Sequence, residues 1–279
     1  MTGVNELQYP RVNFKKDRIL TASMLDIIQS KSEMIWEQFR NAPDGILEGL
    51  DVVRNECGPE LTSGAVKVGG QVYLLCENAD IAGLMKSAEL TEGRTYSLVV
   101  KASEPVRTEE SIVVMNASLE FDEQPSEKAV EIGKFRYAGD FAYSLYSNDA
   151  GDAAEKLRQT LDADTFFSIA VFSHAINGGR TFPPLIFGLM DECLSSKENK
   201  TEFEYSLLMA IRKDGILPLG VLELYIERYT GRMTEKTPDA YISGFLEALR
   251  RAKERAYVIA DDRKEPQAEN AGMGRAIHF

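Results

Sequence analysis

The apolar residues of the chain change their spacing near its middle. Up to about Leu145, short runs of β-branched and aromatic residues alternate with turn-forming groups, a pattern typical of strands. Beyond Gly151 the apolar positions recur every three or four residues, as on one face of a helix. The pattern therefore predicts an α+β protein with a β-rich first part and a helical second part.

The central feature of the β-rich part is a hairpin. Val66 and Val68 alternate with less apolar neighbours, the period of a half-buried strand. Gly69 and Gly70 can both adopt positive φ, which suits a two-residue hairpin turn. The strands expected are 46–53, 65–68, 72–76, 95–101, 111–121, 130–137 and 141–145. Because the crossover helices that parallel strands require are missing, we expect an antiparallel sandwich or a small barrel.

Helices are expected on both sides of these strands. The first begins near Thr21 and ends before Pro43, with Trp36 as a core anchor, and a short helical turn is one reading of 81–86. The later helices expected are 152–159, 162–178, 181–195, 201–213, 218–229 and 237–260. Thr201 and Glu204 form a capping-box pattern at one of these helix starts.

These elements predict three regions. Residues 1–147 would form an N-terminal arm, a helix and a β-rich assembly domain. Residues 148–262 would form a helical bundle, and 263–279 a flexible tail. In the last helix, Glu247 with Arg251 and Arg250 with Glu254 are spaced as i,i+4 ion pairs.

Charge and composition exclude some partners. The formal net charge of −12 opposes binding to nucleic-acid phosphates through general electrostatics. No apolar run is long enough to span a bilayer, and no signal peptide is evident. We therefore expect neither a nucleic-acid partner nor a membrane partner, and we expect synthesis in the cytoplasm. Three widely spaced cysteines fit free thiols better than a disulfide framework.

No group of residues stands out as a catalyst, a cofactor site or a metal site. The chain has only two histidines, and His174 is expected to be a packed helix residue. The segment 177–180 fits an anion-binding turn less well than the end of a helix. Metal-ligand spacings and phosphate-binding loops are missing, so no cofactor is expected. Carboxylates such as Asp44, Glu48 and Asp51 could act as acid and base only if they faced each other across a cleft.

The order of features over residues 11–76 resembles a known kind of module. An aromatic arm leads into a leucine–threonine helix start, a strand with two spaced glycines, and a glycine-linked hairpin. The residues that carry this order are Asn13, Phe14, Leu20, Thr21, Gly45, Gly49, Gly64, Gly69, Gly70 and Tyr73. In this order the segment resembles the N-terminal module of bacteriophage tail and baseplate proteins and of related contractile injection machines.

The resemblance implies a non-enzymatic structural component of a phage or prophage-derived tail or baseplate. Such a part would act through protein–protein assembly with copies of itself, a trimer being one form, and with other tail or baseplate proteins. It would be made in the bacterial cytoplasm and assembled into a virion or tail-like particle. Extended arms that add to a neighbour's sheet are one established mode of such recognition.

Two other functions remain open from the residues alone. One is a ligand- or carbohydrate-binding β-domain with a helical accessory domain, which a shallow aromatic groove would favour. The other is a carboxylate-based hydrolase, which a deep cleft with two facing carboxylates would favour.

Overall fold

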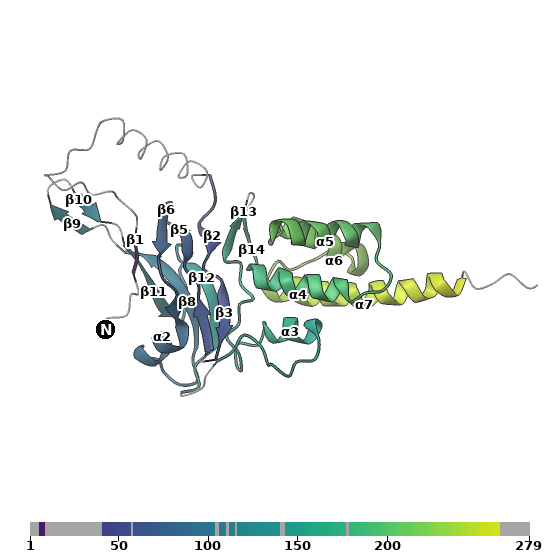
Figure 1. Ribbon diagram of the computed structural model, residues 1–279, viewed down its shortest axis with the longest axis horizontal. Helices are drawn as coiled ribbons and strands as arrows, with labels where there is room; N and C mark the ends of the chain where they lie inside the picture. Colours follow the sequence, from purple (N-terminus) through teal and green to yellow (C-terminus); the bar gives the residue numbers. More distant parts are fainter. Residues whose placement is uncertain are drawn as a thin grey trace, which may run out of the picture.

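The computed structural model describes residues 6–8, 41–56, 58–103, 106–109, 112–114, 116–139, 143–176 and 179–262. This part of the chain is mixed α+β, with six helices and three sheets, as the sequence predicts at that level. The strands gather at one end of the molecule and most helices at the other (Figure 1). The expected first helix, Trp36, and the motif residues Asn13, Phe14, Leu20 and Thr21 lie outside the described residues.

The largest sheet has nine strands. Its order is β12 (Val130–Arg136), β8 (Thr95–Ala102), β11 (Asn116–Asp122), β1 (Glu6–Gln8), β6 (Gln71–Leu75), β5 (Gly64–Val68), β2 (Gly45–Gly49), β13 (His174–Ile176) and β14 (Gly179–Thr181). Its neighbours pair antiparallel except β13 with β2, which are parallel. None of the described sheets closes into a barrel, so the small barrel, one of the two forms expected, is wrong.

Two smaller sheets complete the β part. One contains β3 (Val52–Asn55), β4 (Gly58–Leu61) and β7 (Ala79–Asp80), and the other contains β9 (Val106–Glu109) and β10 (Ile112–Val114). The short helix α2 (Ile81–Ser87) follows β7, and a short helical turn was one of the alternatives that the sequence allowed for this segment.

Three expected strands differ in the structure. The segment 46–53 divides into β2 and β3, in different sheets, because Gly49 and Leu50 turn the chain with φ of 59° and 52°. The segment 111–121 likewise divides into β10 and β11. In the segment 141–145, the described residues 143–145 are not in a strand. There the Tyr143 hydroxyl accepts a hydrogen bond from the Ala138 amide at 2.9 Å and donates one to the Arg136 carbonyl.

The glycine-linked hairpin is confirmed, but its expected half-burial is wrong. Gly69 and Gly70 have φ of 60° and 77° and join β5 to β6. Val66, Lys67 and Val68 are all buried, so both faces of β5 are covered. Alternation fails here because a strand that is covered on both faces has no solvent-facing positions that favour polar residues.

Five of the later helices expected are confirmed, but the helix expected from residue 181 begins at Pro184, because Thr181 pairs with His174 in the sheet. The five helices are α3 (Ala153–Gln159), α4 (Pro184–Ser195), α5 (Glu202–Asp214), α6 (Leu219–Thr230) and α7 (Pro238–Asp262). Thr201 and Glu204 form both halves of the capping box of α5, and Gly215 ends that helix in a left-handed conformation. Within the described ranges, no helix combines the length and apolarity needed to cross a membrane.

The helix expected over 162–178 is wrong. Residues 167–171 are buried one after another, which leaves no polar face, and an uninterrupted buried run suits an extended segment inside the fold. Ser168 exchanges two backbone hydrogen bonds of 2.8 Å with Lys134 of β12, and the Phe167 ring stacks on Phe135 at 6.0 Å. His174 lies in β13 and Gly179 in β14, so Gly179 does not cap a helix.

Candidate functional site

The motif glycines form a tight joint between β2 and β5, which we call the glycine joint (Gly49 and Gly64). A Cβ added to Gly64 would come within 3.0 Å of the Glu48 carbonyl oxygen and the Leu50 amide nitrogen. A Cβ on Gly49 would come equally close to the Ser63 carbonyl oxygen. The glycines are therefore required because two backbones touch there, which is a packing role.

Asp44 holds the hairpin turn, which lies at the opposite end of the β2–β5 pair from this joint. Its carboxylate accepts hydrogen bonds from the Gly69 amide at 2.7 Å and the Gly70 amide at 3.0 Å. The Arg180 guanidinium donates to the Asp44 carbonyl oxygen at 2.6 Å. Asp44 therefore ties together β2, the hairpin and β14. Sequence reasoning missed this contact because Asp44 lies 25 residues before Gly69 in the chain.

The other motif residues lie in the same region. Gly45 begins β2, and a Cβ there would lie 3.0 Å from the Ser173 carbonyl oxygen. Tyr73 of β6 is fully buried, and burial raises the pKa of its hydroxyl. The structure thus brings together the motif residues that it describes, Gly45, Gly49, Gly64, Gly69, Gly70 and Tyr73, on three neighbouring strands.

A serine, a histidine and an aspartate meet beside this region. Ser173 Oγ lies 2.9 Å from His174 Nδ1, and His174 Nε2 lies 3.7 Å from Asp51 Oδ1. A nucleophilic serine must reach its substrate. Here Ser173 is 0% exposed and His174 only 5% exposed, so the serine and the histidine are sealed inside the fold, whereas the Asp51 side chain is 41% exposed. His174 is the packed residue that the sequence predicts, though in a strand.

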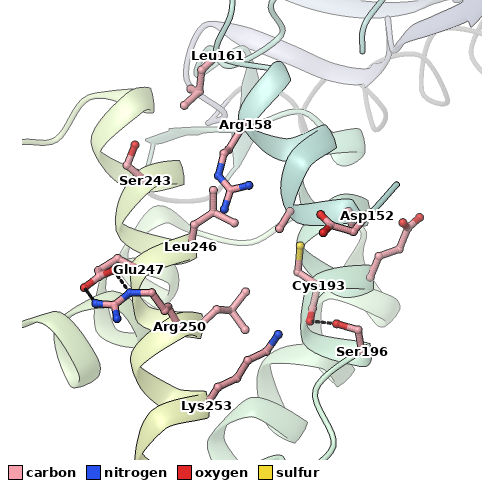
Figure 2. A pocket seen from close by; sticks show the side chains of 14 residues that line it. Asp152, Arg158, Leu161, Cys193, Ser196, Ser243, Leu246, Glu247, Arg250 and Lys253 are labelled. Atoms are coloured by element: carbon pink, nitrogen blue, oxygen red, sulfur yellow. Dashed lines mark hydrogen bonds and ion pairs between the residues drawn. The ribbon is translucent and has the colours of Figure 1, made fainter. Parts of the chain in front are cut away.

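A groove of about 980 Å³ lies among α3, α4 and α7 (Figure 2). Its apolar lining comes from α7, from the first residues of α3 and from Leu161, which follows α3, and charged side chains of both signs surround it. The lining residues are Asp152, Ala153, Ala154, Arg158, Leu161, Glu192, Cys193, Ser196, Ser243, Leu246, Glu247, Leu249, Arg250 and Lys253.

Two of the carboxylates in the groove have structural partners. Asp152 caps α3 by accepting a hydrogen bond from the Glu155 amide at 2.7 Å. Glu247 accepts from Arg250 at 2.7 Å and from Arg251 at 2.6 Å, and these bonds lower its pKa to about 2. A catalytic general acid needs a raised pKa. Both carboxylates are therefore engaged by groups of the chain itself.

The thiol of Cys193 also lines the groove. Cys193 is buried, and burial raises its pKa to about 11, with Asp152 and Glu192 adding to the effect. The thiolate is the reactive form of cysteine, so this side chain stays a neutral thiol near pH 7. Among the residues that the structure describes, no three His, Cys, Asp or Glu side chains gather closely enough to hold a metal ion.

A buried ion pair links the segment after α4 to the first turn of α5, and the middle of α6 contacts it. Lys197 Nζ lies 2.6 and 2.7 Å from the two carboxylate oxygens of Glu204, and both side chains are buried. The Tyr225 hydroxyl donates to Glu204 at 3.3 Å. Burial, followed by the charge of Glu204, raises the pKa of Tyr225. The sequence predicted Glu204 only as a capping residue, because its partner Lys197 lies in a connector without a pattern.

No family model matches the chain, and neither a curated protein nor a solved structure matches it.

Proposed function

We propose that the chain is a non-enzymatic structural component of a phage or prophage-derived tail or baseplate. The observation that supports the proposal is the packing of the described motif residues on three neighbouring strands, with Asp44 holding one end of the β2–β5 pair and the glycine joint closing the other. That arrangement is what a shared structural module requires. In this proposal the sheets form a sandwich-like assembly unit, α3 to α7 form a bundle, and the chain assembles with copies of itself.

The chemistry of the described side chains supports this class of function. The Ser173 and His174 pair is sealed, Cys193 is a protonated thiol, and Glu247 is engaged by two arginines. Each of these groups serves contacts within the chain, as expected for a part that works by shape.

The groove among α3, α4 and α7 is the surface that we assign to a second tail or baseplate protein. Leu161 and Leu246 supply apolar area, and Arg158 and Lys253 lie among its charged groups. An apolar centre with a charged rim is the usual composition of a protein–protein interface.

The direct test is the composition of tail particles from the bacterium that makes this chain. Particles purified by density gradient should contain the chain at a fixed ratio to the other tail proteins, measured by quantitative mass spectrometry. Deleting the gene should stop tail assembly at one defined stage. Intact particles without the chain, both in the wild type and in the deletion strain, would disprove the proposal.

A ligand-binding protein is the second candidate, and the groove favours it. A volume of about 980 Å³ lies at the upper end of the range for small-molecule sites. The groove lies among helices, so a ligand there would contact α3, α4 and α7. A panel of oligosaccharides and small metabolites, screened by the shift in melting temperature, tests this candidate. A shift that disappears in Leu246→Glu would support binding in the groove.

A further inference from the structure

Strand β1 occupies an unusual place in the nine-stranded sheet. Glu6, Leu7 and Gln8 pair antiparallel with Ser118, Ala117 and Asn116 of β11, and Gln8 also pairs with Leu74 of β6. In the strand order, β6 and β11 are joined only through β1. Figure 1 shows β1 as a short segment between these two strands.

Without β1, the sheet would have a slot at its centre. The facing edges of β6 and β11 would each present unpaired amide and carbonyl groups, and such edges pair readily with another strand. β1 is only three residues long, so it contributes few ladder hydrogen bonds. Its release from the slot therefore costs little compared with a long strand.

The chain between β1 and the rest of the sheet is long. Residues 9–40 separate Gln8 from the next described residue, Asn41. At 1.5 Å per residue, even the most compact regular connection of this length would reach about 48 Å, which exceeds the roughly 30 Å diameter of a small domain. The connection therefore allows β1 to fill a slot outside its own subunit.

We propose that, in the assembled protein, β1 of one copy fills the slot between β6 and β11 of a second copy. The slot already accepts this segment in a defined register, so an identical segment from another copy makes the same hydrogen bonds without any new surface. Exchange of an identical element is a low-cost route to oligomers. This inference rests on the proposed function, and it names the segment and the slot through which copies associate.

Disulfide trapping tests the exchange. Glu6 is the register partner of Ser118, and opposite residues of an antiparallel pair bring their Cβ atoms to about 5 Å. One tagged chain carries Glu6→Cys and a second, differently tagged chain carries Ser118→Cys, both with Cys57 and Cys76 changed to serine. The two chains are co-expressed and oxidised. We expect a band that shifts from the mass of one chain to the mass of two.

A matched control places the second cysteine at Asp122, on the same face of β11 but four residues further along. The Glu6→Cys and Asp122→Cys mixture should give no such band. A Glu6→Cys/Ser118→Cys double variant that forms its disulfide only within one chain, with no mixed band from the two single variants, would overturn the exchange. No disulfide in either format would overturn it too.

Light scattering before oxidation separates this inference from the proposed function. An oligomer whose disulfides all lie within single chains leaves assembly standing and rejects strand exchange. A monomer at high concentration rejects self-assembly and exchange together.

Discussion

At the scale of single residues, identical residue types have different physical roles. Gly64 is glycine because two backbones touch there, whereas Gly70 needs a positive φ of 77° in open space. Gly151 has neither constraint. From the sequence the three glycines look alike, and only their surroundings in the structure show how strongly each position requires glycine.

Alanine substitutions at these glycines should therefore differ in cost. Gly64→Ala should lower the free energy of unfolding by about 3 kcal/mol or more, because backbone atoms must shift. Gly70→Ala should cost about 1–2 kcal/mol for its left-handed conformation. Gly151→Ala, the matched control, should be nearly neutral. Urea denaturation measures all three, and a Gly64→Ala midpoint equal to that of Gly151→Ala would contradict the packing role of the glycine joint.

Lys197 should be among the residues least tolerant of replacement. Lys197→Met leaves the buried Glu204 carboxylate without its counter-charge, and breaking a buried pair in this way costs about 3–5 kcal/mol. Removing both charges in Lys197→Met/Glu204→Met should recover part of that loss, even though the capping box is also lost. Thermal and urea denaturation of the three proteins test this. A double variant less stable than Lys197→Met would show that the pair itself is not what matters.

At the scale of elements, local capping and turn signals decide where helices begin and end, and side-chain pairs add to them. In α7, Arg250 lies between Glu247 and Glu254 and forms ion pairs with both. The expected pairs of Glu247 with Arg251 and of Arg250 with Glu254 are both present.

The Glu247 pairs should make stability depend on pH. The pKa of Glu247 falls from an ordinary 4.5 to about 2 in the folded protein, so its stabilising effect is complete above pH 4.5 and is lost as the pH falls towards 2. Glu247→Gln should therefore melt slightly below the wild type at pH 7, and this gap should close towards pH 2. Because the side chain is exposed, salt should also narrow the gap. A gap that is unchanged by both pH and salt would refute the electrostatic origin.

At the scale of the whole molecule, residues 163–176 and 179–181 connect the two ends of the fold. They follow α3 in the chain but pack on the sheet. The backbone of Ser168 is hydrogen-bonded to that of Lys134, and β13 pairs with β2. A single apolar core runs without a break from Ile46 in β2 to Ala252 in α7. Strands β13 and β14 lie beyond the expected boundary near residue 147, and β13 pairs with β2 across it.

A chain that ends at residue 147 should therefore fail to fold. It lacks Phe167, which packs on Phe135, and both β13 and β14. A chain that ends at residue 182 keeps these contacts and serves as the matched comparison. Circular dichroism with urea titration should show a cooperative transition for the longer fragment only. A cooperative transition in the shorter fragment would establish residues 1–147 as an independent domain.

Sequence alone determined the features that depend on neighbours in the chain. The Gly69-Gly70 turn, the Thr201–Glu204 capping box and the Gly215 helix end each result from the local preferences of a few residues. Tertiary structure decided the rest. It placed residues 163–176 and 179–181 on the sheet, buried β5 on both faces, and set Asp44 against the hairpin and Lys197 against Glu204. These outcomes depend on burial between segments far apart in sequence, which the spacing of residues within one segment does not encode.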